Sequence, residues 1–545
     1  KFNSLPKPKI FQNGKYDNSY LLRYDAIVTN WLFDTATAMH SWYSELPKDL
    51  ATLSAFFHRE GRYWKNMASG DMKERLEYNC RDTYATAIVM CEWLREAPLW
   101  AKTNYLQEFP LLFPCLLAEM TGIKRDMEAL KAAYLEVATQ ITTLSASLDT
   151  MLGVKNFNVN SPVQMKQLLT IVGCRDIAAE STDEKHLEAA SFRHPLIARI
   201  LSLVLEIRGL RKLNSTYLVP GKEFEGRILS AFNPHGTDTG RLASREHHFW
   251  CGLQAQNIPA GVTKTTLVAD DGFRIAEVDL EQAESRDTAF ISGSESMIVA
   301  VSGVRDFHSV NASCFFGIPY TAIYDDSTHK VLDKLIRTVA KRVNHGANYN
   351  MGPGVLVQTM GLEAVYAAGK SLKLPAFWTA LQIATYLLQC FHKTYPTLES
   401  VYYAGVIAEI TTTKMITSRA VHDSEFDVAG WTRYCFSDPT KNKRAKNAYV
   451  AHPPQSLNAM TLNKAFLKVF YEISLDPEKG KNFRLLGQVH DSILVEYRLG
   501  YECLAEEVKE YMQIPVTIIG YDGKKRTFTV PAALKLGGKS WEAIE

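Results

Sequence analysis

The stretch "GQVHDSILVEY", residues 487–497, places a His-Asp pair between two apolar runs. Val, Ile and Leu favour β-strands, and a His-Asp-Ser step suits a tight turn. The pattern therefore predicts a β-hairpin that presents Asp491 at its tip. An ordinary polar turn would give the same pattern, so a catalytic interpretation needs a second carboxylate elsewhere in the chain.

A second carboxylate stands in "FRIAEVDLEQAESRDTAF", residues 273–290. An alternating strand from Ile275 to Leu280 carries Asp279 near its end, and we expect a helix to begin in the residues that follow. Two aspartates from distant segments can bind two divalent cations about 4 Å apart, which activates a 3′-hydroxyl and stabilises a leaving phosphate. Two unrelated surface aspartates are the alternative at this point.

A third stretch, "RTVAKRVNHGANYNMGP" (residues 337–353), carries a polar stripe. Four side chains recur at intervals of four residues: Arg337, Lys341, His345 and Tyr349. On a helix they form one slowly drifting line about 18 Å long, and Gly352-Pro353 would end that helix. The cations Arg337 and Lys341 suit a triphosphate, and the planar rings of His345 and Tyr349 suit a base or a sugar. The alternative is an ordinary basic helix face that is exposed to solvent. The apolar residues Val339, Val343 and Ala347 indicate that the other side is packed.

The composition is that of a folded protein with several domains. A chain of 545 residues is long enough for about three to four domains, and 46% of it is hydrophobic. The net charge of +2 means that a nucleic-acid enzyme would have to separate basic grooves from acidic surface. The nine cysteines form no CxxC pair, which favours reduced thiols over zinc sites or disulfides. No apolar run is long enough to span a membrane, and residues 1–11 lack the apolar core of a secretory signal.

The whole chain resembles DNA polymerase I-like enzymes of family A, of the bacteriophage type. Residues 273–290, 337–353 and 487–497 resemble the first palm motif, the fingers helix and the second palm motif. Further similar segments are "FNVNSPVQMKQLL" (157–169), "RGLRKLNSTYL" (208–218), "TGRLAS" (239–244), "QNIP" (256–259), "DFHSVNASCFFG" (306–317), "PPQSLNA" (453–459) and "VPAALKLGGKSW" (530–541). Several motifs in one order are far more specific than any single motif.

The resemblance implies a polymerase site with two Mg²⁺ ions, for which Mn²⁺ could substitute. The implied metal ligands are Asp279, Asp491 and the carbonyl of Leu280. The residues implied to contact the incoming nucleotide are Arg337, Lys341, His345, Tyr349, His308, Glu284 and Gln282. Lys341 would also donate a proton to pyrophosphate, Tyr349 would stack near the templating base, and Glu284 would exclude a 2′-hydroxyl.

Three residues are implied to touch the minor groove near the primer end: Arg241, Gln455 and His490. Correct pairs of every sequence offer similar acceptors there. A structural polar role is the alternative for each of them. The chain departs from the family pattern at Leu280, Glu281, Ala283, His345, Asn350, Ala451 and Ser492. These departures affect the expectations for fidelity, sugar selection and base preference, and none removes an aspartate of the metal pair.

The first part of the chain resembles a 3′–5′ proofreading exonuclease. Residues 10–24 match its second motif through Asn13 and Asp17, and residues 78–87 match its third through Tyr78 and Asp82. The two aspartates would be metal ligands, and the tyrosine would orient the attacking water. The first motif, an Asp-x-Glu pair on a strand, should lie dozens of residues before Asn13. Only twelve residues precede it and none is acidic, so we expect an exonuclease domain that is incomplete at its start.

We therefore expect a right-hand polymerase of mixed α/β and α+β architecture, preceded by part of an RNase H-like exonuclease domain. The sequence pattern predicts helices over residues 76–94, 127–152, 161–172 and 194–218. The expected domains are residues 1–105 (partial exonuclease), 106–225 (helical thumb), 226–304 (first part of the palm), 305–400 (fingers) and 401–545 (second part of the palm). The expected activity is addition of deoxynucleotides to a primer 3′ end during phage genome replication in the cytoplasm of an infected bacterium. Expected partners are primer-template DNA, dNTPs and replication accessory proteins, with no membrane and with a monomeric chain.

Three rival functions are a catalytically silent DNA-binding scaffold, a nuclease that uses only the front domain, and an RNA polymerase of the same superfamily. The presence of both Asp279 and Asp491 favours an enzyme over a scaffold. The missing first exonuclease motif disfavours the nuclease, and Glu284 disfavours the RNA polymerase.

Overall fold

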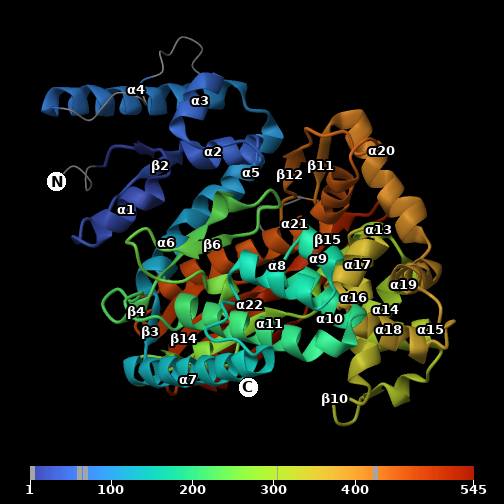
Figure 1. The fold of residues 1–545 in the computed structure, drawn as a ribbon. Helices are drawn as coiled ribbons and strands as arrows, with labels where there is room; N and C mark the ends of the chain where they lie inside the picture. Colours follow the sequence, from blue (N-terminus) through green and yellow to red (C-terminus); the bar gives the residue numbers. More distant parts are fainter. Residues whose placement is uncertain (1–5, 58–63, 65–70, 304, 422–427, 545) are drawn as a thin grey trace.

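A four-stranded antiparallel sheet lies at the centre of the computed structural model, which describes residues 6–57, 64, 71–303, 305–421 and 428–544 (Figure 1). Its strand order is β13–β14–β8–β17. The strands are β8 (Phe273–Leu280), β13 (Phe483–Val489), β14 (Ser492–Arg498) and β17 (Ala532–Gly538). The predicted strand and the predicted hairpin are both confirmed. Because β8 is paired on both edges, its backbone is held firmly on either side of Asp279.

Three helices support this palm sheet: α13 (Ala283–Ser292), α21 (Lys443–Val469) and α22 (Cys503–Met512). Helix α22 packs on β8 and β17, while α21 packs on α22 and α13. Two prolines, Pro453 and Pro454, lie inside α21. Proline has no N–H, so Pro454 leaves the carbonyl of Val450 without its helical donor. The buried Tyr402 hydroxyl donates to that carbonyl at 2.5 Å and replaces the missing bond.

A layer of helices beside the palm contains the segment expected for the fingers, residues 305–400, and it begins earlier, at Glu295 (Figure 1). Its helices are α14 (Glu295–Ser302), α15 (Phe307–Phe316), α16 (Lys334–Asn348), α17 (Pro353–Met360), α18 (Leu362–Ser371) and α19 (Ala380–Thr394). Helix α16 packs against α15, α17, α18 and α19, with Val339, Val343 and Ala347 in the core. The predicted amphipathic helix is therefore confirmed. It ends at Asn348, however, and not at Gly352 as the proline had suggested.

The helical region after residue 106 has an apolar core of its own, which includes Leu148, Met165 and Leu201. Its helices are α7 (Met127–Leu152), α8 (Pro162–Ile171), α9 (Arg175–Glu180), α10 (Glu184–Arg193) and α11 (Ala198–Lys212). The predicted helices at 127–152 and 161–172 are confirmed. The single long helix expected over 194–218 was wrong: a 3-10 turn precedes α11 and a wider turn follows it.

The N-terminal part forms a βαβ unit with further helices. Strand β1 (Lys9–Phe11) runs parallel to β2 (Trp31–Asp34), and α1 (Gly14–Leu22) connects them. The remaining helices are α2 (Thr35–Trp42), α3 (Leu50–Phe57), α4 (Met72–Glu96) and α5 (Leu99–Glu108). They share an apolar core that includes Phe33, Val89 and Trp93. Helix α4, predicted over 76–94, extends away from the rest of the molecule (Figure 1).

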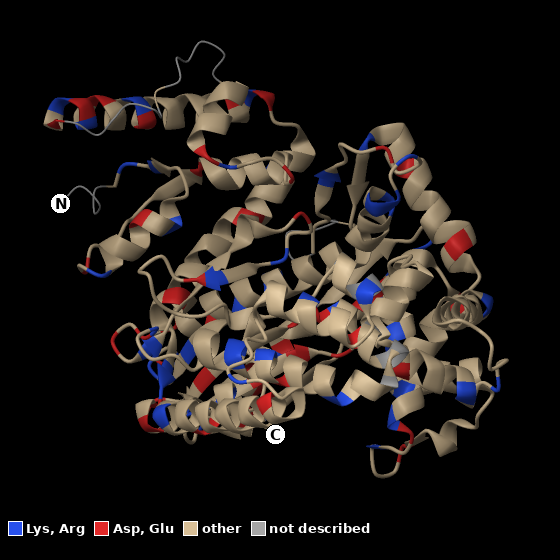
Figure 2. Cartoon of the chain, in the orientation of Figure 1, with Lys and Arg blue, Asp and Glu red and all other residues tan. Residues whose placement is uncertain are grey.

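Charges of both signs occur in every domain, and they alternate along the outer part of α4 (Figure 2). The near-neutral net charge therefore reflects local mixing as well as balance between regions. Within the described residues, no helix combines the length and the apolar content needed to cross a bilayer.

Candidate active site

The register between β8 and β14 brings the two predicted aspartates together. Ser492 is paired with Asp279, and the backbone N–H of Leu280 donates to the carbonyl of Asp491 at 3.1 Å. His490 begins the hairpin turn with a left-handed φ of 55°. The Asp491 carboxylate accepts a hydrogen bond of 2.9 Å from the side chain of Asn458 on α21. Two carboxylates from segments more than 200 residues apart thus share one end of the palm sheet.

The electrostatics of this pair suit a cation. Burial raises the pKa of Asp279 to about 6; Lys535 opposes that rise and Asp491 adds to it. Burial also raises the pKa of Asp491, and the guanidinium of Arg241, 3.5 Å from its Oδ1, opposes that rise. Neighbouring carboxylates with raised pKa values are hard oxygen donors whose repulsion a divalent cation relieves. The residues present therefore fit a metal pair, although the described part of the chain has no group of three or more Asp, Glu, His or Cys side chains that could hold a metal ion.

Glu284 lies at the start of α13 and joins the palm to the fingers helix. Its carboxylate forms an ion pair with Arg241, and its Oε2 lies 3.8 Å from Nδ1 of His345. Although burial acts to raise the pKa of Glu284, the contacts with His345 and Arg241 lower it to about 2. The Tyr349 hydroxyl is buried nearby; burial, and then the Glu284 charge, raise its pKa well above the ordinary value. Glu284 is therefore an ionised carboxylate held between two structural layers.

Arg337, at the basic end of the polar stripe on α16, faces the start of α15. Arg337 binds Asp306 through both ends of its guanidinium, at 2.9 Å and 2.8 Å. His308 is buried on α15, and its Nδ1 lies 3.0 Å from the Asn344 side chain. Burial lowers the pKa of His308 to about 3, with His345 as the next cause. Lys341 is exposed on α16.

A cavity of about 460 Å³ lies between the palm and the loop before β6 (Ala243–Glu246). Its lining includes Arg241, Glu284, Asn458, His490 and Asp491. Polar groups from four separate segments of the chain thus converge on one concave space. Such a cavity is a binding-site candidate on geometric grounds.

Three further predicted polymerase residues, Gln455, Gln282 and Tyr349, are not among those that line this cavity. Gln455 on α21 is a neighbour of the Tyr349 hydroxyl. Gln282 precedes α13 in a left-handed conformation with φ of 54°. The spacing of four residues had placed Tyr349 inside α16. In the structure, Tyr349 follows the last helical residue and caps the helix. The structure thus groups Glu284, His345 and Tyr349, whereas Arg337 turns to Asp306.

The four residues predicted for the exonuclease lie on the βαβ unit and on α4. Asn13 precedes α1 in a left-handed conformation, and Asp17 lies in the first turn of that helix. Tyr78 and Asp82 lie one turn apart on α4, and Asp82 accepts a hydrogen bond of 2.8 Å from the Trp64 indole. The assignment of these residues to a nuclease site stays a prediction.

Sequence reasoning overlooked several residues that hold the site. Asn458 lies three positions after Gln455, so a helical reading of 453–459 would have placed both on one face. Asp306 opens a segment that had been matched to the family, but its role as the partner of Arg337 had no sequence signal. Lys535 reaches Asp279 from β17, and only strand pairing reveals that.

Paired aspartates on an antiparallel palm sheet, faced by helical fingers and flanked by a separate helical layer, define the class of right-hand polymerases. Residues 127–543 match the family described as DNA polymerase family A, so this chain belongs to that family.

Several known proteins are similar to the chain. It is 28% identical over 423 residues to DNA polymerase I, thermostable, from Thermus aquaticus, covering 74% of this chain and 45% of that protein. It is 27% identical over 422 residues to DNA polymerase I from Helicobacter pylori, covering 75% of this chain and 41% of that protein. The chain thus spans less than half the length of these relatives. A solved POL domain of Pol1 from M. smegmatis, in complex with DNA primer-template and dNTP, is 20% identical with a TM-score of 0.77, over 99% of this chain and 88% of that one. This likeness confirms the right-hand fold.

Proposed function

We propose that the chain is a template-directed DNA polymerase that adds deoxynucleotides to a primer 3′ end by two-metal-ion nucleotidyl transfer. The observation that carries this proposal is the β8–β14 register, which sets Asp279 beside the Asp491 that lines the cavity. Membership of family A supports it, because polymerases of this family use divalent metal ions. A pair of carboxylates with raised pKa values has no obvious structural use at this place.

Asp279, Asp491 and the carbonyl of Leu280 are the residues that would hold the ions, with Mg²⁺ as the proposed metal and Mn²⁺ as a substitute. Bound ions supply activation of the 3′-hydroxyl and neutralisation of charge on the leaving phosphate. Asn458 orients the Asp491 carboxylate by donating to its Oδ1. Arg241 limits the rise in the pKa of Asp491, which favours the ionised form that a metal requires.

The incoming nucleotide is proposed to lie along α16. Arg337, Lys341 and His308 would contact the triphosphate, and Lys341 would donate a proton to the departing pyrophosphate. Lys341 is exposed and can turn toward a ligand, whereas the bidentate contact with Asp306 fixes the Arg337 guanidinium in advance. Such fixing lowers the entropy lost on binding.

The sugar, the base and the primer end are proposed to meet the other side of the cavity. Glu284 would lie under the sugar, where its fixed and ionised carboxylate leaves no room for a 2′-hydroxyl. Tyr349 would stack near the templating base, with His345 and Gln282 as further nucleotide contacts. The primer end would meet three minor-groove contacts: Arg241, Gln455 and His490.

Primer extension tests the proposal directly. The chain of residues 1–545 should extend a primed template with Mg²⁺ and dNTPs, should stop after one dideoxynucleotide, and should use rNTPs poorly. The matched control is the double variant Asp279→Asn, Asp491→Asn, which should bind the same DNA without extending it. Template-independent addition, or equal use of rNTPs and dNTPs, would contradict the proposed activity.

Proofreading is proposed for the parent protein through the N-terminal domain. The supporting observation is the βαβ unit, which carries Asn13 and Asp17 at the start of α1, and α4, which carries Tyr78 and Asp82. Asp17 and Asp82 would be its metal ligands. Replication of a phage genome in an infected cell, accessory replication proteins and a monomeric chain stay predictions, and the relatives named above are bacterial.

A further inference from the structure

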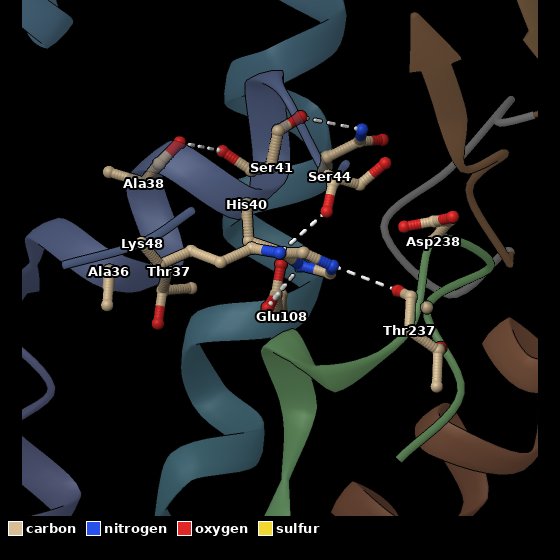
Figure 3. Close-up of polar contacts among 12 residues, drawn as sticks. Ala36, Thr37, Ala38, His40, Ser41, Ser44, Lys48, Glu108, Thr237 and Asp238 are labelled. Atoms are coloured by element: carbon tan, nitrogen blue, oxygen red, sulfur yellow. Dashed lines mark hydrogen bonds and ion pairs between the residues drawn. The ribbon is translucent and has the colours of Figure 1, made fainter. Parts of the chain in front are cut away.

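His40 is buried where the N-terminal domain meets the palm, and it is not among the residues that line the cavity beside Asp491. It lies on α2 and has no exposed surface. Its Nδ1 lies 2.8 Å from Oε1 of Glu108, the last residue of α5. Its Nε2 lies 2.9 Å from the backbone carbonyl oxygen of Thr237 (Figure 3). His40 therefore connects two helices of the N-terminal domain to a loop of the palm.

The chemistry of these two contacts fixes where the protons lie. A backbone carbonyl can only accept, so Nε2 of His40 must carry a proton and donate it to Thr237. At Nδ1 the partner is a carboxyl group, so one further proton lies between Nδ1 and Oε1 of Glu108, whichever of the two atoms holds it. Both ring nitrogens are used, and an apolar ring of similar size cannot replace them.

The carbonyl that His40 binds opens the turn that presents Arg241. Thr237 Oγ1 donates to the carbonyl of Arg241 at 2.8 Å, and the N–H of Gly240 donates to the carbonyl of Thr237 at 3.4 Å. Arg241 in turn forms the ion pair with Glu284 and lies 3.5 Å from Asp491. A chain of direct contacts thus runs from His40 to the carboxylates of the polymerase site.

The palm side also contacts this turn, at Gly240 and Asp238, so His40 at Thr237 completes a set of contacts that come from both domains. Asn463 on α21 donates to the carbonyl of Gly240 at 2.8 Å. A side chain at Gly240 would meet Met460 at 2.5 Å, and the φ of +78° favours glycine. Arg433 binds Asp238 at 3.1 Å while also binding Glu45 of the N-terminal domain.

We propose that His40 is a positioning residue of the polymerase site. By donating to the Thr237 carbonyl it holds the 237–241 turn, and thereby keeps Arg241 within reach of Glu284 and Asp491. This inference rests on the proposed role of Arg241 at the primer end. The N-terminal domain then supports nucleotide addition directly, whether or not it performs nuclease chemistry.

Variants of different reach at position 40 test the inference. The amide nitrogen of Gln can occupy the place of Nε2 and still donate to Thr237. Asn is shorter by one methylene and cannot reach, and Phe keeps the ring without a donor. Ser19→Ala is the matched control, because Ser19 contacts His248 across the same pair of domains but has no link to the turn.

Two measurements are made on each full-length variant. Single-nucleotide incorporation at saturating primer-template DNA should show kcat reduced about 5- to 20-fold in His40→Phe and His40→Asn. In His40→Gln and Ser19→Ala, kcat should change less than about twofold. Amide hydrogen exchange in residues 237–243 should be faster by about fivefold or more in His40→Phe and His40→Asn, and in neither of the other two variants. This measurement does not depend on enzymatic activity.

A double-mutant cycle with Arg241→Ala decides whether His40 acts through Arg241. Arg241→Ala should lower kcat by itself, and His40→Phe should then add less than about twofold. Independent, multiplicative losses would overturn the inference while leaving the proposed polymerase function intact. If Arg241→Ala has no effect, the proposed role of Arg241 fails together with the inference. If Ser19→Ala slows incorporation as much as His40→Phe, general loosening of the interface is the cause, and the inference is wrong.

Discussion

Asp279 and Asp491 sit in one site but have different surroundings. Asn458 and Arg241 contact the Asp491 carboxylate, whereas Lys535 is the cation that acts on Asp279. Neither carboxylate is neutralised by a bidentate ion pair. Both are therefore free to serve as metal ligands, which is the basis of the first and third of the predictions at the scale of single residues.

The first prediction concerns loss of a metal ligand. Asp279→Asn or Asp491→Asn should reduce primer extension by roughly 1,000-fold or more, because each removes a charge that a divalent ion requires. Binding of primer-template DNA, measured by fluorescence anisotropy, should change less than about twofold. Asp271→Asn is the control, since that side chain is 92% exposed and pairs with Lys124 instead. Near-normal extension by either site variant would refute the two-metal assignment.

The second prediction concerns sugar selection. Glu284→Ala should raise the ratio of ribonucleotide to deoxynucleotide incorporation by about tenfold or more, because it opens the space under the sugar. Single-nucleotide insertion with matched rNTP and dNTP measures the ratio. Glu284→Gln keeps the volume and should keep most of the discrimination. An unchanged ratio in Glu284→Ala would show that another group excludes the 2′-hydroxyl.

The third prediction links pH, metal and stability. The pKa of Asp279 is about 6 in the folded protein, whereas its ordinary value, taken for the unfolded chain, is 3.8. Between these two pH values the folded state therefore binds more protons than the unfolded state. Stability from this group is therefore lost as pH rises from about 4 to about 6, and the loss is complete at pH 7.

Thermal unfolding at pH 7 measures this linkage. With a chelator present, Asp279→Asn should melt about 1–2 °C above the parent, because it removes the buried charge. Millimolar Mg²⁺ should raise the melting temperature of the parent and leave that of Asp279→Asn nearly unchanged. A parent that gains nothing from Mg²⁺ at pH 7 would argue against metal binding by Asp279.

At the scale of elements, the β13–β14 hairpin depends on Gly487. Its φ of +151° is unusual for other residues, and an added Cβ would lie 2.2 Å from the Phe232 ring. The register of the hairpin also shifts between Leu485 and Gly487. The glycine thus lets β13 pass close to Phe232 while Asp491 stays at the tip.

The fourth prediction follows from that close approach. Gly487→Ala should destabilise the protein by about 1–3 kcal/mol and slow extension, because Phe232 and the hairpin must move apart. Gly500→Ala is the matched control: its φ is +89°, but nothing lies within 4 Å of the added Cβ. Gly500→Ala thus measures the free-energy cost of a positive φ in a non-glycine residue without any steric clash. It should leave primer extension unchanged. Equal destabilisation by both variants would show that backbone conformation alone is responsible.

At the scale of the whole molecule, buried polar contacts join the N-terminal domain to the polymerase body. Lys15 on α1 forms a buried ion pair with Glu119 on α6 (Leu112–Thr121). Asn104 on α5 donates to the carbonyl of Thr432 at 2.7 Å and accepts from its N–H at 3.1 Å. Removing one partner of such a contact leaves the other buried without a hydrogen bond, which destabilises the folded state. The N-terminal domain and the polymerase body are therefore expected to unfold together.

The fifth prediction concerns proofreading by the whole chain. A protein that begins at Lys1 should remove mismatched 3′ ends slowly or not at all, because two predicted ligands, Asp17 and Asp82, cannot neutralise two divalent ions. The strand-end carboxylate of Asp34 does not supply a third, since four backbone N–H groups occupy it. Degradation of a mismatched primer without dNTPs measures the activity, with Asp82→Asn as control. Brisk removal that depends on Asp82 would show that other residues complete the site.

The local sequence determined the elements that carry the site. Alternating apolar residues predicted β8, the His-Asp step predicted the hairpin, and i, i+4 spacing predicted α16, because each pattern is a property of a short segment. These patterns, with the order of motifs, were enough to indicate a right-hand polymerase. The exact end of α16 and the turns flanking α11 were missed, since they depend on packing against other segments.

Only the tertiary structure decided which distant groups meet. The approach of Asp491 to Asp279 was inferred from family resemblance, but the contacts of Lys535 and Asp306 had no local signal. The same holds for His40, whose position in a mixed helix gives no hint of the palm carbonyl that it binds. Hydrogen bonds between segments depend on strand register and domain packing, and these are set by the burial of the whole apolar core and not by any single stretch.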